Sequence, residues 1–478
     1  MFSVQKMSLK KRIARNFIVS FVGRFLAGAL GVASLAFITR TLGSEKFGEY
    51  NIVFAYLYIF LVLADFGLNS LLAREISKPG ADEKEIISRM FSVKIFLLAF
   101  FTGASFLLLF LTPYSSSVKI GVLVASLGFV FSSLAGVLMG VFQKHLKTAA
   151  PAIADVSARL TQLTLVFILY KYGGGLRSFL TVFVLGSAIH FALICFFAKK
   201  YSGFRFSFNI AGLKSVLKES WPLALSAVLV LVYFKGDTII LSFMKTPYDV
   251  GIYGVAYKIL ENIIFFPIMF VGLVAPLLSR YFISDQEAFK KVFQKTLDFL
   301  LVIAVPLVLG GIYVARDIVE LIAGRGFEAA SPVLQILLLA VFFIFLGALF
   351  GSTVITINKQ KSVMYVYGLA AVFNISANLY FIGRYSYIGA AWVTAATELF
   401  VSLGMLLIIR KTMNYLPDFN IMAKALAASL LMTALLHASP SQNLFALLAL
   451  GAASYAVFMY ILGGITKEDF LTLIRREF

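Results

Sequence analysis

Charged residues and cysteine are scarce in this chain of 478 residues. Asp, Glu, Lys and Arg make up 14% of it, whereas a soluble domain usually carries about 25% charged residues. The single cysteine, Cys195, excludes an intramolecular disulfide and any cysteine cluster around a metal. His145, His190 and His437 are widely scattered and lack metal-ligand spacing. The sequence therefore argues against a soluble protein and predicts neither a metal site nor a bound cofactor.

The motifs of common enzyme classes are also missing. The chain has no G-x-x-x-x-G-K-[ST] phosphate loop, so we do not expect it to hydrolyse ATP in that way. It has no G-x-S-x-G nucleophile elbow. Its outer loops are too short to carry a glycosyl-transfer or polymerase site. We therefore expect a protein that is not an enzyme, with an integral membrane glycosyltransferase or polymerase as the remote alternative.

Long apolar runs take up most of the chain, and hydrophobic residues make up 60% of it. A helix needs roughly 20 apolar residues to cross the hydrocarbon core of a bilayer. The runs are continuous, unlike the alternating strands of a membrane β-barrel, and lipid favours helices because they satisfy their own backbone. The sequence thus predicts an all-α polytopic membrane protein with about fourteen spans: 16–38, 50–73, 90–111, 118–142, 151–171, 178–198, 220–243, 250–278, 297–315, 331–357, 362–383, 387–409, 421–438 and 443–464.

The basic residues that give the chain its net charge of +19 are distributed unevenly between the loops on the two sides of the membrane. The loops on the side of the two termini hold roughly three times as many Lys and Arg residues as the opposite loops. The positive-inside rule then places both termini in the cytoplasm. We expect the chain to be a multi-pass protein of the plasma (inner) membrane. We therefore expect no nucleic-acid partner. The run 16–38 is too long for a signal peptide and is not followed by a small-x-small cleavage site, so it is interpreted as a retained first helix.

A duplicated organisation is indicated by the longest inner loop and by a short internal echo. Phe47-Gly48-Glu49-Tyr50 enters the second span, and Val250-Gly251-Ile252-Tyr253 enters the eighth. Both read apolar-Gly-x-Tyr at the matching place in each half, as parallel repeats of transporters do. The predicted parts are an N-terminal lobe of six helices (1–198), a cytoplasmic linker (199–219), a C-terminal lobe of six helices (220–411) and a terminal pair with a tail (412–478).

Ionisable residues deep in the spans are the candidate functional residues. Each costs roughly 2.5–3.5 kcal/mol at the centre of a membrane helix. We therefore expect them to face a hydrated central cavity rather than lipid. They are Arg24, Asp65, Asp155, Arg159, Lys235, Asp237, Lys258, Glu261 and Glu398.

Spacing suggests what some of these residues do. Asp155 and Arg159 are spaced i,i+4, and Lys258 and Glu261 are spaced i,i+3, so each couple is either a structural ion pair or part of a site. Lys235 and Asp237 are two residues apart and cannot share one face of a regular helix. The acidic candidates for coupling to an ion are Asp65, Asp237, Glu261 and Glu398.

Arg24 is the best candidate for a contact with an anion, because a guanidinium fits phosphate oxygens in bidentate geometry. The alternative is an interhelical pair of Arg24 with Asp65 or Asp237. Asn374 and Asn378 stack one turn apart and either line a path for sugars or hold helices together. The candidate substrate-binding set is Arg24, Arg159, Lys235, Lys258, Asn374 and Asn378.

Several short motifs follow one another along nearly the whole chain. They are Arg40-Thr41-Leu42-Gly43, Phe47-Gly48-Glu49-Tyr50, Asp65-Phe66-Gly67-Leu68, Arg74-Glu75, Trp221-Pro222-Leu223, Val250-Gly251-Ile252-Tyr253, Ala256-Tyr257-Lys258-Ile259-Leu260-Glu261 and Ile388-Gly389-Ala390-Ala391. Their order and spacing resemble the polysaccharide-biosynthesis flippases. These are Wzx-type transporters of O-antigen and repeat units in the multidrug/oligosaccharidyl-lipid/polysaccharide exporter superfamily.

The resemblance implies two six-helix lobes around a central cavity, with two further helices. It also implies an activity: moving a polyprenyl-diphosphate-linked oligosaccharide to the outer leaflet by alternating access, coupled to a proton or sodium gradient. A glycan polymerase or ligase is the partner that such an activity would serve. The close alternatives are a cation-coupled multidrug antiporter and a peptidoglycan-precursor flippase of the same superfamily. The last two helices carry few charges and would border a lateral gap for the lipid tail.

Overall fold

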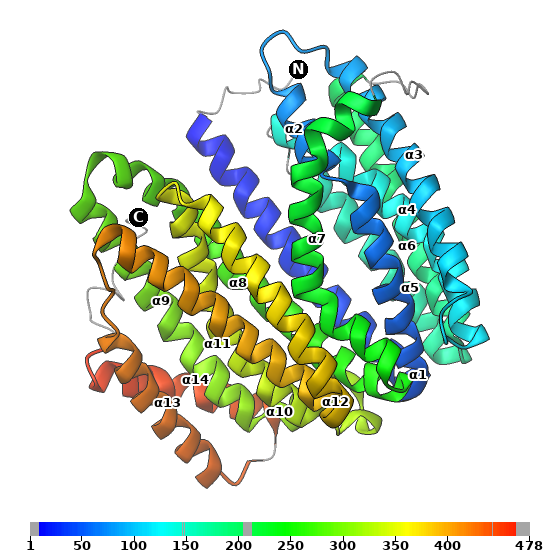
Figure 1. The fold of residues 1–478 in the computed structure, drawn as a ribbon. Coiled ribbons are helices and arrows are strands. Elements are labelled where there is room, and N and C mark those ends of the chain that lie inside the picture. The colour runs from blue at the N-terminus through cyan, green and yellow to red at the C-terminus, as the bar shows by residue number, and fades with distance from the viewer. Residues whose placement is uncertain (1–8, 146, 148, 204–212, 442, 465–478) are drawn as a thin grey trace, which may run out of the picture. The chain divides into compact units, whose positions relative to one another are not determined.

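The computed structural model describes residues 9–145, 147, 149–203, 213–441 and 443–464, which form helices and short connections (Figure 1). The predicted linker 199–219 and the tail after 464 lie partly or wholly outside these residues. The helices are α1 (Leu9–Asp65), α2 (Leu68–Ile76), α3 (Glu83–Leu109), α4 (Ser116–Lys144), α5 (Ala149–Tyr172), α6 (Leu176–Ser202), α7 (Leu213–Met244), α8 (Pro247–Ser284), α9 (Gln286–Tyr313), α10 (Ala315–Ala323), a 3₁₀ turn η1 (Arg325–Phe327), α11 (Ala330–Thr356), α12 (Gln360–Met413), α13 (Asn420–Ala438) and α14 (Leu444–Ile461).

The all-α membrane fold is confirmed. Within the described residues, eleven helices are long and apolar enough to cross a membrane. Two of them are far too long for one crossing: α1 has 57 residues and α12 has 54, whereas the hydrocarbon core takes about 20 residues of helix. The long helix α12 contains two of the predicted spans, α1 contains one and most of the span 50–73, whose end lies in α2, and α7 contains another. The observed helices are therefore consistent with fourteen spans.

The breaks inside the two long helices lie at a glycine and a serine. Gly43 has φ 69° in α1, and Ser386 has φ 50° in α12. A positive φ ends the helical hydrogen-bond pattern, and glycine adopts it without steric cost. By contrast, α8 is continuous through Pro267 and Pro276.

Polar side chains cap the helix ends between the apolar runs. The carboxylate of Asp82 accepts hydrogen bonds from the first turn of α3, and that of Asp285 does the same for α9. Ser115 caps α4 and Asn443 caps α14 in the same way. Such caps satisfy backbone N–H groups that a helix leaves unpaired at its start. They place the helix starts where the apolar pattern alone leaves them uncertain.

The chain packs as two compact units, residues 1–251 with 322–326, and residues 252–321 with 327–478. In the first unit α4 is the most enclosed helix and packs on α1, α3 and α6. In the second unit α11 is the most enclosed and packs on α9 and α12. The predicted lobe bounds stay predictions, because these units are defined by internal packing alone.

The two echoing motifs meet at a close backbone crossing in the first unit. A Cβ atom added to Gly48 would lie 1.6 Å from the carbonyl oxygen of Pro247. A Cβ atom added to Gly251 would lie 2.1 Å from the carbonyl oxygen of Ser44. No side chain fits at such distances, so both glycines are required for this approach. The glycine in each apolar-Gly-x-Tyr motif therefore has a packing role.

Candidate functional site

An ion pair with a buried lysine lies at the junction between α1 and α2. The chain turns there because Phe66 and Gly67 both have positive φ. The ammonium of Lys94 on α3 donates a hydrogen bond to Asp65 Oδ1 at 2.7 Å, and the pair is asymmetric, with the Lys94 side chain 0% exposed and that of Asp65 24% exposed. Burial of a lysine amine in a membrane helix is tolerated only with such a partner.

Lys94 was missed by the sequence analysis, although the signal for it was present. It lies within the predicted span 90–111, in the same apolar context as the embedded residues that were selected. Its partner is 29 positions away in the chain. No local spacing rule reaches that far, so the pairing itself required the fold.

A second ion pair lies on α5 beside the first part of α1. Arg159 Nε donates to Asp155 Oδ1 at 3.2 Å, as the i,i+4 spacing predicted. A Cβ atom added to Gly31 of α1 would lie 3.2 Å from Arg159 Nη1, so this glycine makes room for the guanidinium. Arg24 lies two turns before Gly31, on the same face of α1, and is exposed. Arg24 and Arg159 thus belong to the region where α1 packs on α5.

The α7 residues of the candidate set differ in burial. Asp237 is buried, and its Oδ1 accepts hydrogen bonds from the backbone N–H and the hydroxyl of Thr238, at 2.6 and 3.3 Å. Lys235 is half-buried on the same continuous helix. Both hydrogen bonds come from the next residue along the chain, so they tie the Asp237 carboxylate to the backbone of α7.

In the second unit, Lys258 and Glu261 form the predicted pair on α8. The Lys258 ammonium donates to Glu261 Oε2 at 2.8 Å, and both side chains are partly exposed. This pair is therefore accessible, unlike the pair at Asp65 and Lys94. Partial exposure leaves both groups able to meet a charged ligand or an ion.

The two asparagines lie in a buried chain of hydrogen bonds within α12. Asn378 Nδ2 donates to Asn374 Oδ1 at 2.9 Å, and Asn374 Nδ2 donates to Thr397 Oγ1 at 3.3 Å. Thr397 lies beyond the break at Ser386, so the contact joins the two parts of α12. Glu398, the next residue, is also buried. This arrangement matches the helix-joining role of the asparagines better than an open sugar path.

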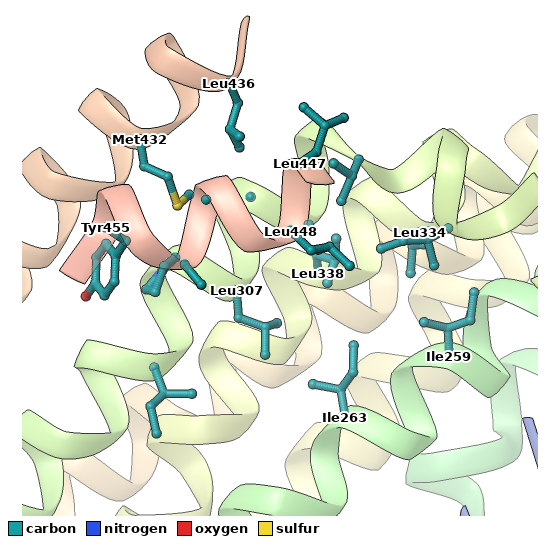
Figure 2. Close-up of a pocket in the computed structure, with 18 of the residues that line it drawn as sticks. Ile259, Ile263, Leu307, Leu334, Leu338, Met432, Leu436, Leu447, Leu448 and Tyr455 are labelled. Atoms are coloured by element: carbon teal, nitrogen blue, oxygen red, sulfur yellow. The ribbon is translucent and has the colours of Figure 1, made fainter. Parts of the chain in front are cut away.

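The second unit also contains a pocket of about 490 Å³ with an apolar lining. Ligand pockets commonly measure about 300–1,000 Å³. Side chains from α8, α9, α11, α13 and α14 converge on it, and Figure 2 shows them. The residues labelled there are Ile259, Ile263, Leu307, Leu334, Leu338, Met432, Leu436, Leu447, Leu448 and Tyr455. The sequence analysis expected the last two helices to border a gap for a lipid tail, and these two helices form one side of this pocket.

Comparison with known proteins identifies related families. The family model described as "Polysaccharide biosynthesis protein" matches residues 13–282, and the MatE model matches residues 222–380. The capsular polysaccharide biosynthesis protein CapF of Staphylococcus aureus is 24% identical over 82% of this chain and 97% of its own length. The "Probable low-salt glycan biosynthesis flippase Agl15" of Haloferax volcanii is 20% identical over 80% of each chain.

Among solved structures, the lipid II flippase MurJ in an inward closed conformation has a similar fold. The two superpose with a TM-score of 0.78 and 17% identity, over 93% of this chain and 98% of that one. An inward-facing multidrug resistance transporter of the MATE family superposes with a TM-score of 0.65 and 14% identity, over 83% and 99% of the two chains. At these identities the likeness concerns the fold.

Proposed function

Because the chain belongs to the polysaccharide biosynthesis protein family, we propose that it is a flippase for polyprenyl-diphosphate-linked oligosaccharides. It moves these repeat units from the cytoplasmic to the outer leaflet by alternating access, for assembly of a surface polysaccharide or glycan. The names of CapF and Agl15 refer to capsular polysaccharide biosynthesis and to a glycan flippase, and this supports a glycan cargo. A polymerase or ligase that receives the flipped unit is its expected partner.

The apolar pocket is the observation that carries this proposal. A glycan or a diphosphate gains nothing from a lining of leucine, isoleucine, valine and glycine, whereas a polyprenyl chain does. Leu448 of α14 and Leu307 of α9 point into the pocket (Figure 2), while Phe445 and Val457 on α14 are exposed at the protein surface. The lipid tail of the substrate is therefore the occupant we assign to it.

The polar part of the substrate requires positive charge and hydrogen-bonding groups. Arg24 and Arg159 are assigned to the diphosphate, because two guanidiniums near one helix face suit its oxygens. Lys235 and Lys258 are further candidates for the same anion. For sugar contacts we retain Asn374 and Asn378, although their mutual hydrogen bond favours a role in joining the parts of α12.

An ion gradient is the proposed energy source, and the match to the MatE model supports it. Glu261 is accessible and next to Lys258, which makes it the first candidate for coupling. Asp237 and Glu398 are buried candidates. Asp65 stays in the set, but its bond with Lys94 already supplies it with a cation from within the protein. Both termini are proposed to lie in the cytoplasm and the protein in the plasma membrane.

The test uses purified protein in sealed liposomes that contain a fluorescent polyprenyl-diphosphate oligosaccharide. Accessibility of the glycan to an external glycan-cleaving enzyme is followed with and without a proton or sodium gradient. Protein-dependent movement is expected, and Arg24→Ala should abolish it while the protein still inserts. Arg384→Ala is the matched control, since Arg384 stacks on Tyr380 and is not one of the residues assigned to the diphosphate. Normal movement by Arg24→Ala would refute its assignment to the diphosphate.

The pocket is tested separately by filling it. Leu338 is buried and lines the pocket, so Leu338→Trp should slow movement of the full substrate. Leu399 on α12 is exposed and does not line the pocket, so Leu399→Trp should leave the rate unchanged. Equal rates of substrate movement in the two variants would refute the assignment of the lipid tail to this pocket.

A cation-coupled multidrug antiporter is the second candidate, because the MatE model matches residues 222–380. The same liposomes then need a second cargo, a cationic fluorescent dye. Efflux of the dye without movement of the lipid-linked glycan would favour this candidate and would make the embedded carboxylates the cargo site.

A further inference from the structure

Pro306 leaves one backbone carbonyl of α9 without its usual partner. Proline has no backbone N–H, so the carbonyl four residues earlier, that of Val302, loses its hydrogen bond within the helix. Pro306 and Val302 both line the apolar pocket. An unsatisfied carbonyl in such surroundings is strongly unfavourable, because no water is there to bind it.

The hydroxyl of Tyr455 on α14 supplies the missing donor. It donates to the Val302 carbonyl oxygen at 2.8 Å, and the Tyr455 side chain is itself buried at the edge of the pocket (Figure 2). Within the described part of the chain, Tyr455 is the one side chain of α14 whose recorded hydrogen bond reaches another helix; the Ser454 hydroxyl bonds back to Gly451 of its own helix.

The close backbone packing of α14 is on α13, and Lys424 of α13 donates a hydrogen bond to the Gly463 carbonyl just after α14. The pocket occupies the space between α14 and helices α8, α9 and α11. The side of α14 that faces α9 therefore has one polar contact, shares an apolar cluster with Val305 of α9, and borders the apolar pocket.

We propose that α14 is a movable wall of the pocket and that the Tyr455 hydroxyl is the latch that holds this wall on α9. With the latch closed, the Val302 carbonyl is satisfied and α14 covers the pocket. With the latch open, the bare carbonyl favours a return to the closed position, while the apolar lining faces the bilayer and admits a polyprenyl chain. The admission of that chain rests on the function proposed above, whereas the latch does not.

The latch is tested by measuring the position of α14 directly. Cys195 is replaced by serine, and spin labels are attached at cysteines substituted for Phe299 on α9 and Val457 on α14, both of which are exposed. Pulsed electron–electron double resonance in nanodiscs gives the distribution of distances between the two labels. The ratio of long to short distances is the ratio of molecules with α14 in the open position to molecules with α14 in the closed position. An interhelical hydrogen bond in a membrane corresponds to about a 3- to 20-fold change in such a ratio. Tyr455→Phe should raise the ratio by that amount.

Two further variants separate the latch from a general loss of packing. Alanine at position 306 returns an N–H to the Val302 carbonyl, so Tyr455→Phe should have little effect when combined with Pro306→Ala. Tyr313→Phe is the matched control: the Tyr313 hydroxyl donates to the Leu436 carbonyl at 3.0 Å, but that carbonyl also accepts from the Ser439 N–H. Tyr313→Phe should therefore leave the ratio of long to short distances unchanged.

Transport by the same variants distinguishes the latch from the proposed function. An unchanged distance ratio in Tyr455→Phe, or an equal rise in the Pro306→Ala background, would overturn the latch. A raised ratio with an altered rate of glycan movement supports both ideas. A raised ratio with no change in that rate would leave the latch standing and would show that the pocket does not receive the substrate tail.

Discussion

Removing Asp65 should destabilise the protein more than removing Lys94. In Asp65→Asn the Lys94 ammonium stays behind with a side chain that is 0% exposed and no carboxylate beside it. An uncompensated buried charge costs about 3–5 kcal/mol of the free energy of unfolding. In Lys94→Met the carboxylate of Asp65 stays behind, but its side chain is 24% exposed and it can keep part of its hydration. We expect that variant to lose about 1–2 kcal/mol.

The double variant, Asp65→Asn with Lys94→Met, removes the stranded charge in either case. Replacing a whole buried pair is often neutral, so its loss should be no more than about 1 kcal/mol and well below the sum of the two single losses. The measurement is the free energy of unfolding in mixed micelles for the four proteins of this cycle. Lys290→Met is the matched control, because the Lys290–Glu287 pair on α9 is largely exposed and should be worth less than about 1 kcal/mol.

Two results would refute this reasoning. Equal losses in the two single variants would mean that burial does not decide the cost. Additive losses in the double variant would mean that the two groups do not act as a pair. Additive losses would also return Asp65 to the role of a free carboxylate available for ion coupling.

Two smaller predictions concern the glycine crossing and the end of α2. Gly48→Ala should cost upward of about 3 kcal/mol of stability, because its Cβ would lie 1.6 Å from the Pro247 carbonyl oxygen; Gly103→Ala, with open space around it, should cost nothing measurable in the same unfolding assay. A hydrogen bond from Lys78 holds the pKa of Glu75 below its ordinary value of 4.5. A lowered pKa stabilises the fold above that pH, and this contribution is lost as the pH falls through the pKa of the folded state. Melting curves from neutral to acidic pH should therefore show a smaller acid-induced loss in Glu75→Gln than in the parent.

The sequence was sufficient for the helices because lipid leaves the backbone few choices. Most of each predicted span lies in an observed helix, although the span 50–73 is broken between α1 and α2. The pairs Asp155–Arg159 and Lys258–Glu261 form as their spacing predicted. Both pairs depend only on the geometry of one helix. Local periodicity is enough to place such residues on a common face.

Features that depend on distant segments required the structure. The partner of Asp65 is on another helix, and the donor to the Val302 carbonyl is 153 positions along the chain. The short helix α10 was assigned to a loop, because nine residues are too few to form a span. The breaks inside α1 and α12 lie at Gly43 and Ser386, and neither residue was singled out as a break by the sequence analysis. A positive φ at a serine depends on its surroundings and has no reliable sequence signal.

The glycine crossing also sets an order in time. Gly48 reaches the ribosome exit early, but the backbone that it must touch, around Pro247 and Gly251, is synthesised about 200 residues later. At about 5–20 residues per second, this segment waits on the order of 10–40 seconds for its partner. During that interval the kink at Gly43 has none of its final neighbours from α8. Final assembly of the first unit therefore follows insertion of its first helix by a delay that is long compared with helix formation, and this interval is when a membrane chaperone would find the kink exposed.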